Sequence, residues 1–203
     1  MPKLEIYRQR ARSLLSRSFE TPIINLLSRV GVTPNQLTAL GLLVSIGAAF
    51  LATQGHFLEA GITLAVAGIL DLLDGGLARA TGKSSSQGAL LDSLADRISE
   101  IALLLGILIY YVCRGSDFWW QPVLVYLALA NGFLVSYLRA RSESLGITAK
   151  VGVMTRSERV LVLIIGLLLG WIEVALAVIT IMSIATWMHR FINAWNSLGK
   201  APK

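Results

Sequence analysis

The chain has 203 residues, of which 55% are hydrophobic and only 15% are charged, and its formal net charge is +6. Its mean hydropathy is +0.66, whereas about a quarter of the residues of a soluble domain are charged. The composition therefore excludes an ordinary soluble domain and indicates one integral membrane bundle.

Residues 1–32 precede the first apolar run and differ from the rest of the chain. Apolar residues recur there at helical spacing from Leu4 to Phe19, and four arginines lie between them. This pattern predicts an amphipathic helix on the cytoplasmic membrane surface, although a simple positively charged anchor explains the arginines equally well. Thr33 and Pro34 then open the first span, with Thr33 as N-cap and Pro34 at the first helical position.

Six apolar segments follow, and they predict six transmembrane helices. Their limits are Leu37–Ala52, Leu58–Leu73, Ala89–Val112, Pro122–Tyr137, Val160–Ile172 and Val174–His189. Several are shorter than the ~20 residues that cross a bilayer core, but the second and the fourth can extend as helices into their polar ends. The predicted fold is an all-α integral membrane protein: residues 1–32 form the juxtamembrane segment, 33–198 the six-helix domain and 199–203 a cytoplasmic tail.

Basic residues are concentrated on one side of this predicted topology. Of the 18 Lys and Arg residues, only Arg114 falls in a predicted external loop. Because cytoplasmic loops are enriched in Lys and Arg, both termini are expected in the cytoplasm of a multi-pass cell-membrane protein. The positive charge thus reflects membrane topology and anion binding, and we expect no nucleic-acid partner.

Four carboxylates lie at helical spacing inside this apolar sequence. Asp71 and Asp74 are three residues apart, Asp92 and Asp96 are four apart, and the short polar segment Thr81–Gln87 joins the two helices. Each pair therefore projects from one helix face, and the two helices should be antiparallel neighbours. Carboxylates within a membrane protein are costly and usually functional. Four of them facing one another favour a hard divalent cation such as Mg²⁺ or Mn²⁺ between them.

Small residues and one arginine accompany the carboxylates. Gly75, Ala78 and Gly88 leave room for a ligand close to the backbone, and Arg79 is a forked donor suited to phosphate. Small residues are also common where transmembrane helices pack together, so either glycine alone would indicate packing. The combination with four aspartates favours a metal site that acts on phosphates, at the cytoplasmic end of the helices.

The order of these residues resembles the signature of the CDP-alcohol phosphotransferases. The matching pattern is Asp71-Leu-Leu-Asp74-Gly75-Gly-Leu-Ala78-Arg79, eight residues, Gly88, three residues, Asp92, three residues and Asp96. The six spans and the surface helix agree with that family, so the resemblance extends over almost the whole chain. It implies an enzyme, active as a homodimer, that transfers a substituted phosphate from a CDP-linked donor to an alcohol and releases CMP.

The resemblance also implies a role for individual residues. Asp71, Asp74 and Asp92 would hold two Mg²⁺ ions, with Mn²⁺ as an alternative, and Asp96 would contribute to the second ion and act as general base. The residues matching the family's contacts with the CDP-lipid are Asn35, Gln36, Leu37, Thr38, Asp74, Gly75, Ala78, Arg79, Ser85 and Gly88.

Arginines in the C-terminal half indicate the kind of acceptor. Four of them are expected to gather near the mouth of the carboxylate site, namely Arg139, Arg156, Arg159 and Arg190. An acceptor that carries its own phosphate would explain this many cations. Positive-inside anchoring is the alternative, which we prefer for Arg141, whereas Glu158 between Arg156 and Arg159 favours a fixed network.

The same four arginines match a subfamily that joins inositol 1-phosphate to CDP-diacylglycerol, or to an ether-lipid equivalent in archaea. The resemblance therefore implies inositol 1-phosphate as acceptor, with membrane lipids as further partners. One alternative is glycerol 3-phosphate, which is also anionic. Another is a cation-conducting membrane protein. That class would place carboxylates along the membrane midplane, and no inverted repeat is evident.

Overall fold

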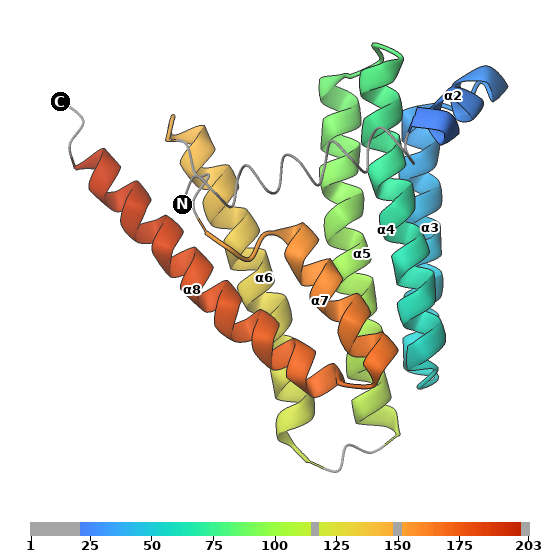
Figure 1. Cartoon of the computed structure of the whole chain (residues 1–203). Coiled ribbons are helices and arrows are strands. Elements are labelled where there is room, and N and C mark those ends of the chain that lie inside the picture. Colours follow the sequence, from blue (N-terminus) through green and yellow to red (C-terminus); the bar gives the residue numbers. More distant parts are fainter. Residues whose placement is uncertain (1–20, 115–117, 148–151, 200–203) are drawn as a thin grey trace. The chain divides into compact units, whose positions relative to one another are not determined.

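A computed structural model describes residues 21–114, 118–147 and 152–199, and the regular elements in these ranges are α-helices (Figure 1). In chain order they are α2 (Thr21–Val30), α3 (Pro34–Thr53), α4 (Phe57–Ala80), α5 (Ser86–Cys113), α6 (Trp120–Ser144), α7 (Arg156–Leu169) and α8 (Ile172–Leu198). The surface helix predicted over Leu4–Phe19, and all of the 199–203 tail except Gly199, lie outside the described residues.

The predicted apolar segments agree with these helices except at one boundary. Five of the six segments lie wholly inside one helix, and α4 and α6 extend into their polar ends as predicted. The segment predicted as Val160–Ile172 is too long, because α7 ends at Leu169 and Ile172 begins α8. The cause is Gly170, which adopts a left-handed φ of 70° and terminates the helix, as glycine does at this position.

The start of α3 follows local sequence rules. Thr33 precedes Pro34, and the Thr33 hydroxyl accepts the Gln36 N–H at 3.4 Å while the Gln36 Oε1 accepts the Thr33 N–H at 2.9 Å. This reciprocal pair is a capping box, which satisfies two backbone donors at the helix start. The predicted N-cap is therefore confirmed. Helix α2, which the apolar pattern did not single out, immediately precedes this cap.

The described residues divide into two compact units. The first unit covers residues 21–44 and 66–98, which are α2 and parts of α3, α4 and α5. Its apolar core joins Ile24 of α2 to Leu37 of α3 and to Leu73 and Leu77 of α4. Burial of these side chains fixes the start of α3 against the end of α4.

The second unit covers residues 45–65 and the described residues from 99 onward, including α6, α7 and α8. Its core contains Leu103 and Ile107 of α5, Leu163 of α7 and Leu176 of α8. A Cβ on Gly106 would overlap the Ala49 carbonyl oxygen. The helix backbones therefore touch there, which is typical of packing in membranes.

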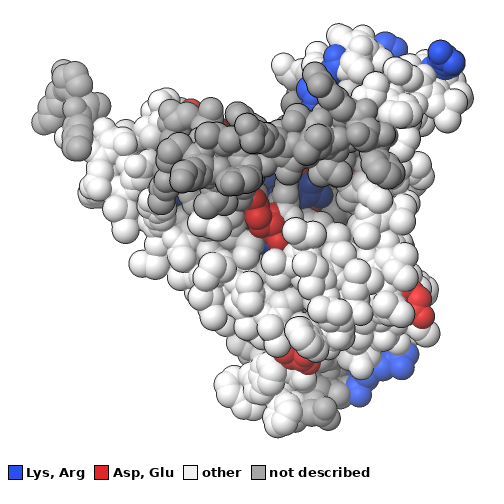
Figure 2. Space-filling view, in the orientation of Figure 1, with Lys and Arg blue, Asp and Glu red and all other residues white. Residues whose placement is uncertain are grey.

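The surface of the described helices is apolar. Three of them, α3, α6 and α8, are long and apolar enough to cross a membrane. Large apolar side chains point outward, including Phe50 and Ile181, which are 65% and 60% exposed. Most of the face shown in Figure 2 carries neither Lys and Arg nor Asp and Glu. Because so much exposed apolar surface requires lipid, the chain is an all-α membrane protein.

Candidate functional site

Three of the four predicted carboxylates meet in the first unit. Asp71 and Asp74 come from α4 and Asp92 from α5, and one carboxylate oxygen of each lies within 4.8 Å of the others. Asp74 is buried, whereas Asp71 and Asp92 are half-buried. As expected, α4 and α5 therefore face each other at this end of α4.

Like charges at this separation repel one another. Two unit charges 4.8 Å apart cost about 3 kcal/mol at an effective dielectric constant of about 20. A divalent cation between them converts this repulsion into attraction. Because carboxylate oxygens are the donors that Mg²⁺ and Mn²⁺ prefer, the residues present fit such an ion.

A buried hydroxyl orients the central carboxylate. The Thr38 Oγ1 donates to the Asp74 Oδ2 at 2.7 Å and lies 3.1 Å from the Pro34 carbonyl oxygen. Thr38 and Asp74 are both buried, and a buried hydrogen bond to a charged group is stronger than one in water. The start of α3 is therefore tied directly to the carboxylate group.

A pocket of about 180 Å³ adjoins Asp74 and Asp92 in the same unit. It is lined by residues of α3, of α4 and α5, and of the loop that connects α4 to α5. Eight of the ten residues predicted to contact the CDP-lipid line it: Asn35, Thr38, Asp74, Gly75, Ala78, Arg79, Ser85 and Gly88. The remaining lining residues are Pro34, Lys83, Ser84, Ala89 and the predicted metal ligand Asp92.

Two glycines let polar groups converge on this pocket. A Cβ on Gly75 would lie 3.2 Å from the Arg79 NH1, and a Cβ on Gly88 would lie 3.3 Å from the Asn35 Oδ1. The Gly88 N–H donates to the Ser85 Oγ at 3.0 Å. A side chain at either position would therefore push the neighbouring polar atom aside by a few tenths of an ångström.

The structure places Gln36 and Leu37 away from the pocket lining. Gln36 caps α3 through Thr33, and Leu37 is 4% exposed within the apolar cluster of the first unit. These residues hold the helix start that carries Asn35 and Thr38. The signal for the cap was present in the sequence, since Thr-x-x-Gln before an apolar run is typical of a capping box.

Lys83 is a lining residue that sequence reasoning missed. After α4 ends at Ala80, Gly82 adopts a φ of 66°, and the Lys83 N–H donates to the Ala78 carbonyl oxygen at 3.1 Å. This hydrogen bond is the long bond of a Schellman motif, which fixes the residue after the glycine. Gly82, two residues after the last helical residue, was the available signal.

Asp96 lies one turn beyond Asp92 on α5 and is half-buried. It is not a member of the group of three carboxylates. The structure therefore separates three clustered carboxylates from a fourth one further along the same helix.

The four predicted arginines all belong to the second unit, in different environments. Arg159 and Arg190 are buried, with 1% and 3% exposure, whereas the Arg139 side chain is 57% exposed and pairs with Glu143 at 3.0 Å. Arg156 is half-buried at the start of α7. The Arg190 NH1 donates to the Val135 carbonyl oxygen at 2.8 Å. Charges of both signs act on Arg190, from Arg139 and Arg159 and from Glu143 and Glu158.

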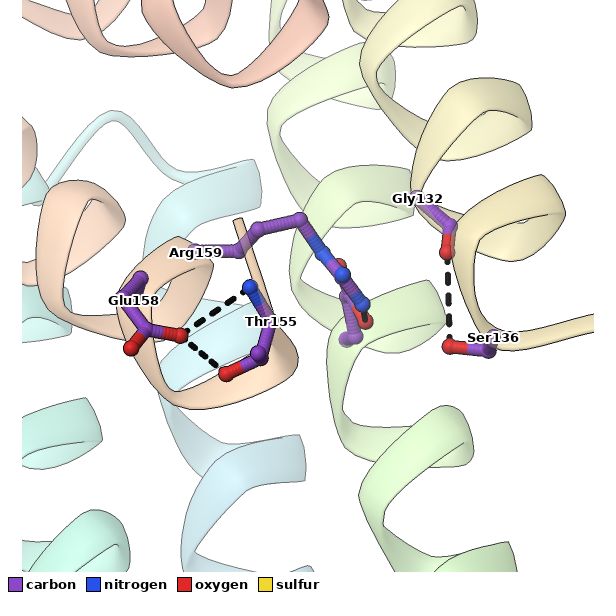
Figure 3. A network of polar contacts seen from close by, with 6 residues as sticks. Gly132, Ser136, Thr155, Glu158 and Arg159 are labelled. Carbon is purple, nitrogen blue, oxygen red and sulfur yellow. Dashed lines mark hydrogen bonds and ion pairs between the residues drawn. The ribbon is translucent and has the colours of Figure 1, made fainter. Parts of the chain in front are cut away.

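Two glutamates organise the start of α7. The Glu158 carboxylate accepts the Thr155 N–H at 3.0 Å and the Thr155 side chain accepts the Glu158 N–H, which together form a capping box. The Thr155 hydroxyl also donates to the Glu158 carboxylate (Figure 3). Glu100 of α5, which sequence reasoning missed, accepts from the Arg159 Nε at 2.6 Å and from its NH2 at 2.7 Å. The fixed network expected around Glu158 therefore includes a helix cap, and Arg159 has a separate buried partner.

Comparison with known proteins agrees with this geometry. The model of a family described as CDP-alcohol phosphatidyltransferase matches residues 31–192. An archaetidylinositol phosphate synthase from Pyrococcus horikoshii is 37% identical over 169 residues, which cover 83% of this chain and 86% of that protein.

Solved structures of a phosphatidylinositol phosphate synthase from Mycobacterium tuberculosis are also similar, at 27% identity. The one with CDP-DAG bound has a TM-score of 0.80 and covers 87% of this chain and 94% of that one. The complex with manganese and citrate has a TM-score of 0.79, with 87% and 89% covered.

Proposed function

The chain belongs to the CDP-alcohol phosphatidyltransferase family, and on that premise we propose that it synthesises phosphatidylinositol phosphate. It transfers a phosphatidyl group from CDP-diacylglycerol, or an ether-lipid equivalent, to a hydroxyl of inositol 1-phosphate and releases CMP. The observation that carries the proposal is the group of three carboxylates beside a pocket lined by the family's signature residues. The similar proteins are named for making an inositol phosphate lipid, which supports the acceptor.

The first unit holds the CDP head group in this proposal. Asp71, Asp74 and Asp92 are the ligands of two divalent cations, and Asp96 contributes to the second. A divalent cation bound there neutralises charge on the pyrophosphate and on the departing CMP. The manganese complex of the similar structure supports this assignment.

The pocket residues bind the rest of the nucleotide. Gly75 and Gly88 admit it close to the backbone, and the Arg79 guanidinium donates to phosphate oxygens. Thr38 holds the Asp74 carboxylate in one orientation through its 2.7 Å hydrogen bond. The ligands are thus oriented before the donor binds, which lowers the entropy cost of reaction.

The transfer itself needs one proton acceptor. The acceptor hydroxyl oxygen forms a bond to the lipid-linked phosphorus, the bond from that phosphorus to the bridging pyrophosphate oxygen breaks, and CMP takes the electron pair. Asp96 receives the hydroxyl proton. Its half-buried position outside the group of three carboxylates supports this role, because a base must keep an accessible lone pair.

The arginines of the second unit bind the acceptor's phosphate. Arg139, Arg156, Arg159 and Arg190 supply the donors, because guanidinium groups form strong charge-assisted hydrogen bonds to phosphate. Glycerol 3-phosphate also carries a phosphate and is the competing acceptor.

Helices α3 to α8 form six spans in this proposal, with both termini and the site on the cytoplasmic side. The distribution of basic residues supports this topology, because 17 of the 18 Lys and Arg residues lie on that side or at its helix ends. The active form is a homodimer, as in the family that the sequence resembles.

Release of CMP tests the proposal. Purified protein in detergent, with CDP-diacylglycerol and Mg²⁺, is expected to release CMP with inositol 1-phosphate and not with glycerol 3-phosphate. Release with glycerol 3-phosphate alone would retain the transferase mechanism and replace the acceptor. Absence of release with either would contradict the proposed function.

A further inference from the structure

Arg159 is held from one side by a buried carboxylate. Its Nε donates to the Glu100 Oε1 at 2.6 Å and its NH2 donates to the Glu100 Oε2 at 2.7 Å. The Arg159 side chain is 1% exposed and that of Glu100 is 10% exposed. Two parallel hydrogen bonds between planar groups fix the guanidinium in one orientation. This pair is a rigid element of the second unit.

The third guanidinium nitrogen of Arg159, NH1, takes no part in the pair with Glu100. NH1 is buried and has no hydrogen-bond partner among the described residues. Buried donors are nearly always satisfied, so an unsatisfied one in a native structure requires an explanation. Because the donor belongs to a cation, an anionic oxygen is the group that satisfies it best.

Gly132 of α6 lies against both members of the pair. A Cβ at this position would stand 3.1 Å from the Glu100 Oε1 and 3.2 Å from the Arg159 Nε. These contacts are tighter than van der Waals packing, and neither partner can yield without breaking the fork. Only glycine therefore leaves the pair where it is.

We propose that Glu100 and Gly132 are positioning residues for the acceptor: they hold Arg159 so that NH1 faces the acceptor's phosphate as a fixed donor. This inference rests on the proposed function, which places Arg159 among the phosphate-binding arginines. Arg159 touches the substrate, and Glu100 and Gly132 act through it.

The effect of removing the Glu100 charge has an opposite sign under the two possible roles. Glu100 is an anion beside an anion-binding set of arginines. If it acted only through its charge, neutralising it would strengthen the binding of a phosphate. If it positions Arg159, the same change loosens the guanidinium and weakens that binding.

The decisive variant is therefore Glu100→Gln, which keeps the shape and removes the charge. We expect its KM for inositol 1-phosphate to rise about tenfold, with the KM for CDP-diacylglycerol unchanged. Glu59→Gln is the matched control, because Glu59 is exposed and pairs with His56 rather than with an arginine of the acceptor set, and its acceptor KM should not rise. A fall or no change in the acceptor KM of Glu100→Gln would overturn the proposal.

A second variant moves the pair without touching any charge. Gly132→Ala should raise the acceptor KM several-fold, because the added methyl displaces both partners by a few tenths of an ångström. Gly68→Ala is the control, since a Cβ there meets nothing within 4 Å, and it should change neither KM. If Glu100→Gln fails to fold, Gly132→Ala decides: an unchanged acceptor KM then rejects the proposal.

A competition measurement separates this inference from the proposed function. Inorganic phosphate should inhibit CMP release competitively with the phosphorylated acceptor, and more weakly in Glu100→Gln than in the wild type. If the wild type turns over glycerol 3-phosphate instead, the proposed acceptor is wrong, and the same comparison is made with that acceptor. Equal inhibition of the wild type and Glu100→Gln by phosphate would contradict the positioning role whichever acceptor is used.

Discussion

The carboxylates of the first unit and the arginines of the second are charged groups in an apolar protein, and they are stabilised differently. Asp71, Asp74 and Asp92 are gathered with oxygens within 4.8 Å of one another, where a divalent cation would relieve their repulsion. Arg159 and Arg139 instead pair with glutamates of their own unit. The geometry of the three carboxylates is therefore expected to depend on a bound cation, whereas Arg159 and Arg139 keep much of their geometry without a bound anion.

The largest expected effect comes from replacing aspartates of the carboxylate site. Asp92→Asn and Asp96→Asn should each lower the rate of CMP release by about a thousandfold, because they remove a metal ligand and the general base. Both variants should still fold, because Asn keeps the size and shape of Asp, and circular dichroism checks this. Glu59→Gln, in an exposed pair with His56, is the control that should retain activity. Substantial turnover in either aspartate variant contradicts the assignment.

On the arginine side, Arg156→Ala should raise the acceptor KM by about tenfold to a hundredfold. The KM for CDP-diacylglycerol should stay the same, because Arg156 is assigned to the acceptor's phosphate and not to the donor. Arg141→Ala is the matched control, since we interpret Arg141 as a membrane-side anchor. Two-substrate steady-state kinetics measure both constants. An unchanged acceptor KM together with a large fall in kcat would contradict a binding role.

A smaller change tests how the acidic group is preorganised. Thr38→Val removes the 2.7 Å hydrogen bond to Asp74 while keeping the side-chain volume. We expect kcat/KM for CDP-diacylglycerol to fall about tenfold, because a hydrogen bond to a charged group is lost. Thr38→Ser retains the hydroxyl and should recover most of the activity. If Val and Ser behave alike, the hydrogen bond has no role in orientation.

The smallest effect concerns the pocket rim. Lys83 is exposed and lines the pocket, so Lys83→Met should raise the KM for CDP-diacylglycerol only about two- to threefold. The difference from the wild type should shrink as salt is raised from low concentration, since exposed charges are screened. Kinetics at two ionic strengths measure this. A difference that persists at high salt would indicate a direct packed contact instead.

Local periodicity explains why the acidic site could be predicted. The spacing of Asp71 and Asp74 on one helix, and of Asp92 on the next, fixes which faces they share. A short loop then makes the helices neighbours. The ten donor contacts were implied by the family resemblance instead, and eight of them line the pocket. Gln36 was assigned from family resemblance, although its spacing from Thr33 already indicated a helix cap.

The arginine region depends on contacts that spacing cannot reveal. Arg159 and Glu100 are 59 residues apart in the chain, and only helix packing brings them together. One signal was available, since Glu100 lies four residues after Asp96 and continues the same acidic spacing on α5. The C-terminal end of α7 could not be predicted from the apolar pattern either, because the sequence is apolar on both sides of Gly170.

The most direct test compares inositol 1-phosphate with unphosphorylated inositol, with and without Mg²⁺, in CMP release from CDP-diacylglycerol by the purified protein. If the arginines bind the acceptor's phosphate, CMP is released with inositol 1-phosphate and not with unphosphorylated inositol. If the carboxylates hold catalytic cations, the release requires Mg²⁺ and EDTA abolishes it. Equal release with unphosphorylated inositol would contradict the role of the arginines. Release that survives EDTA would contradict the role of the carboxylates.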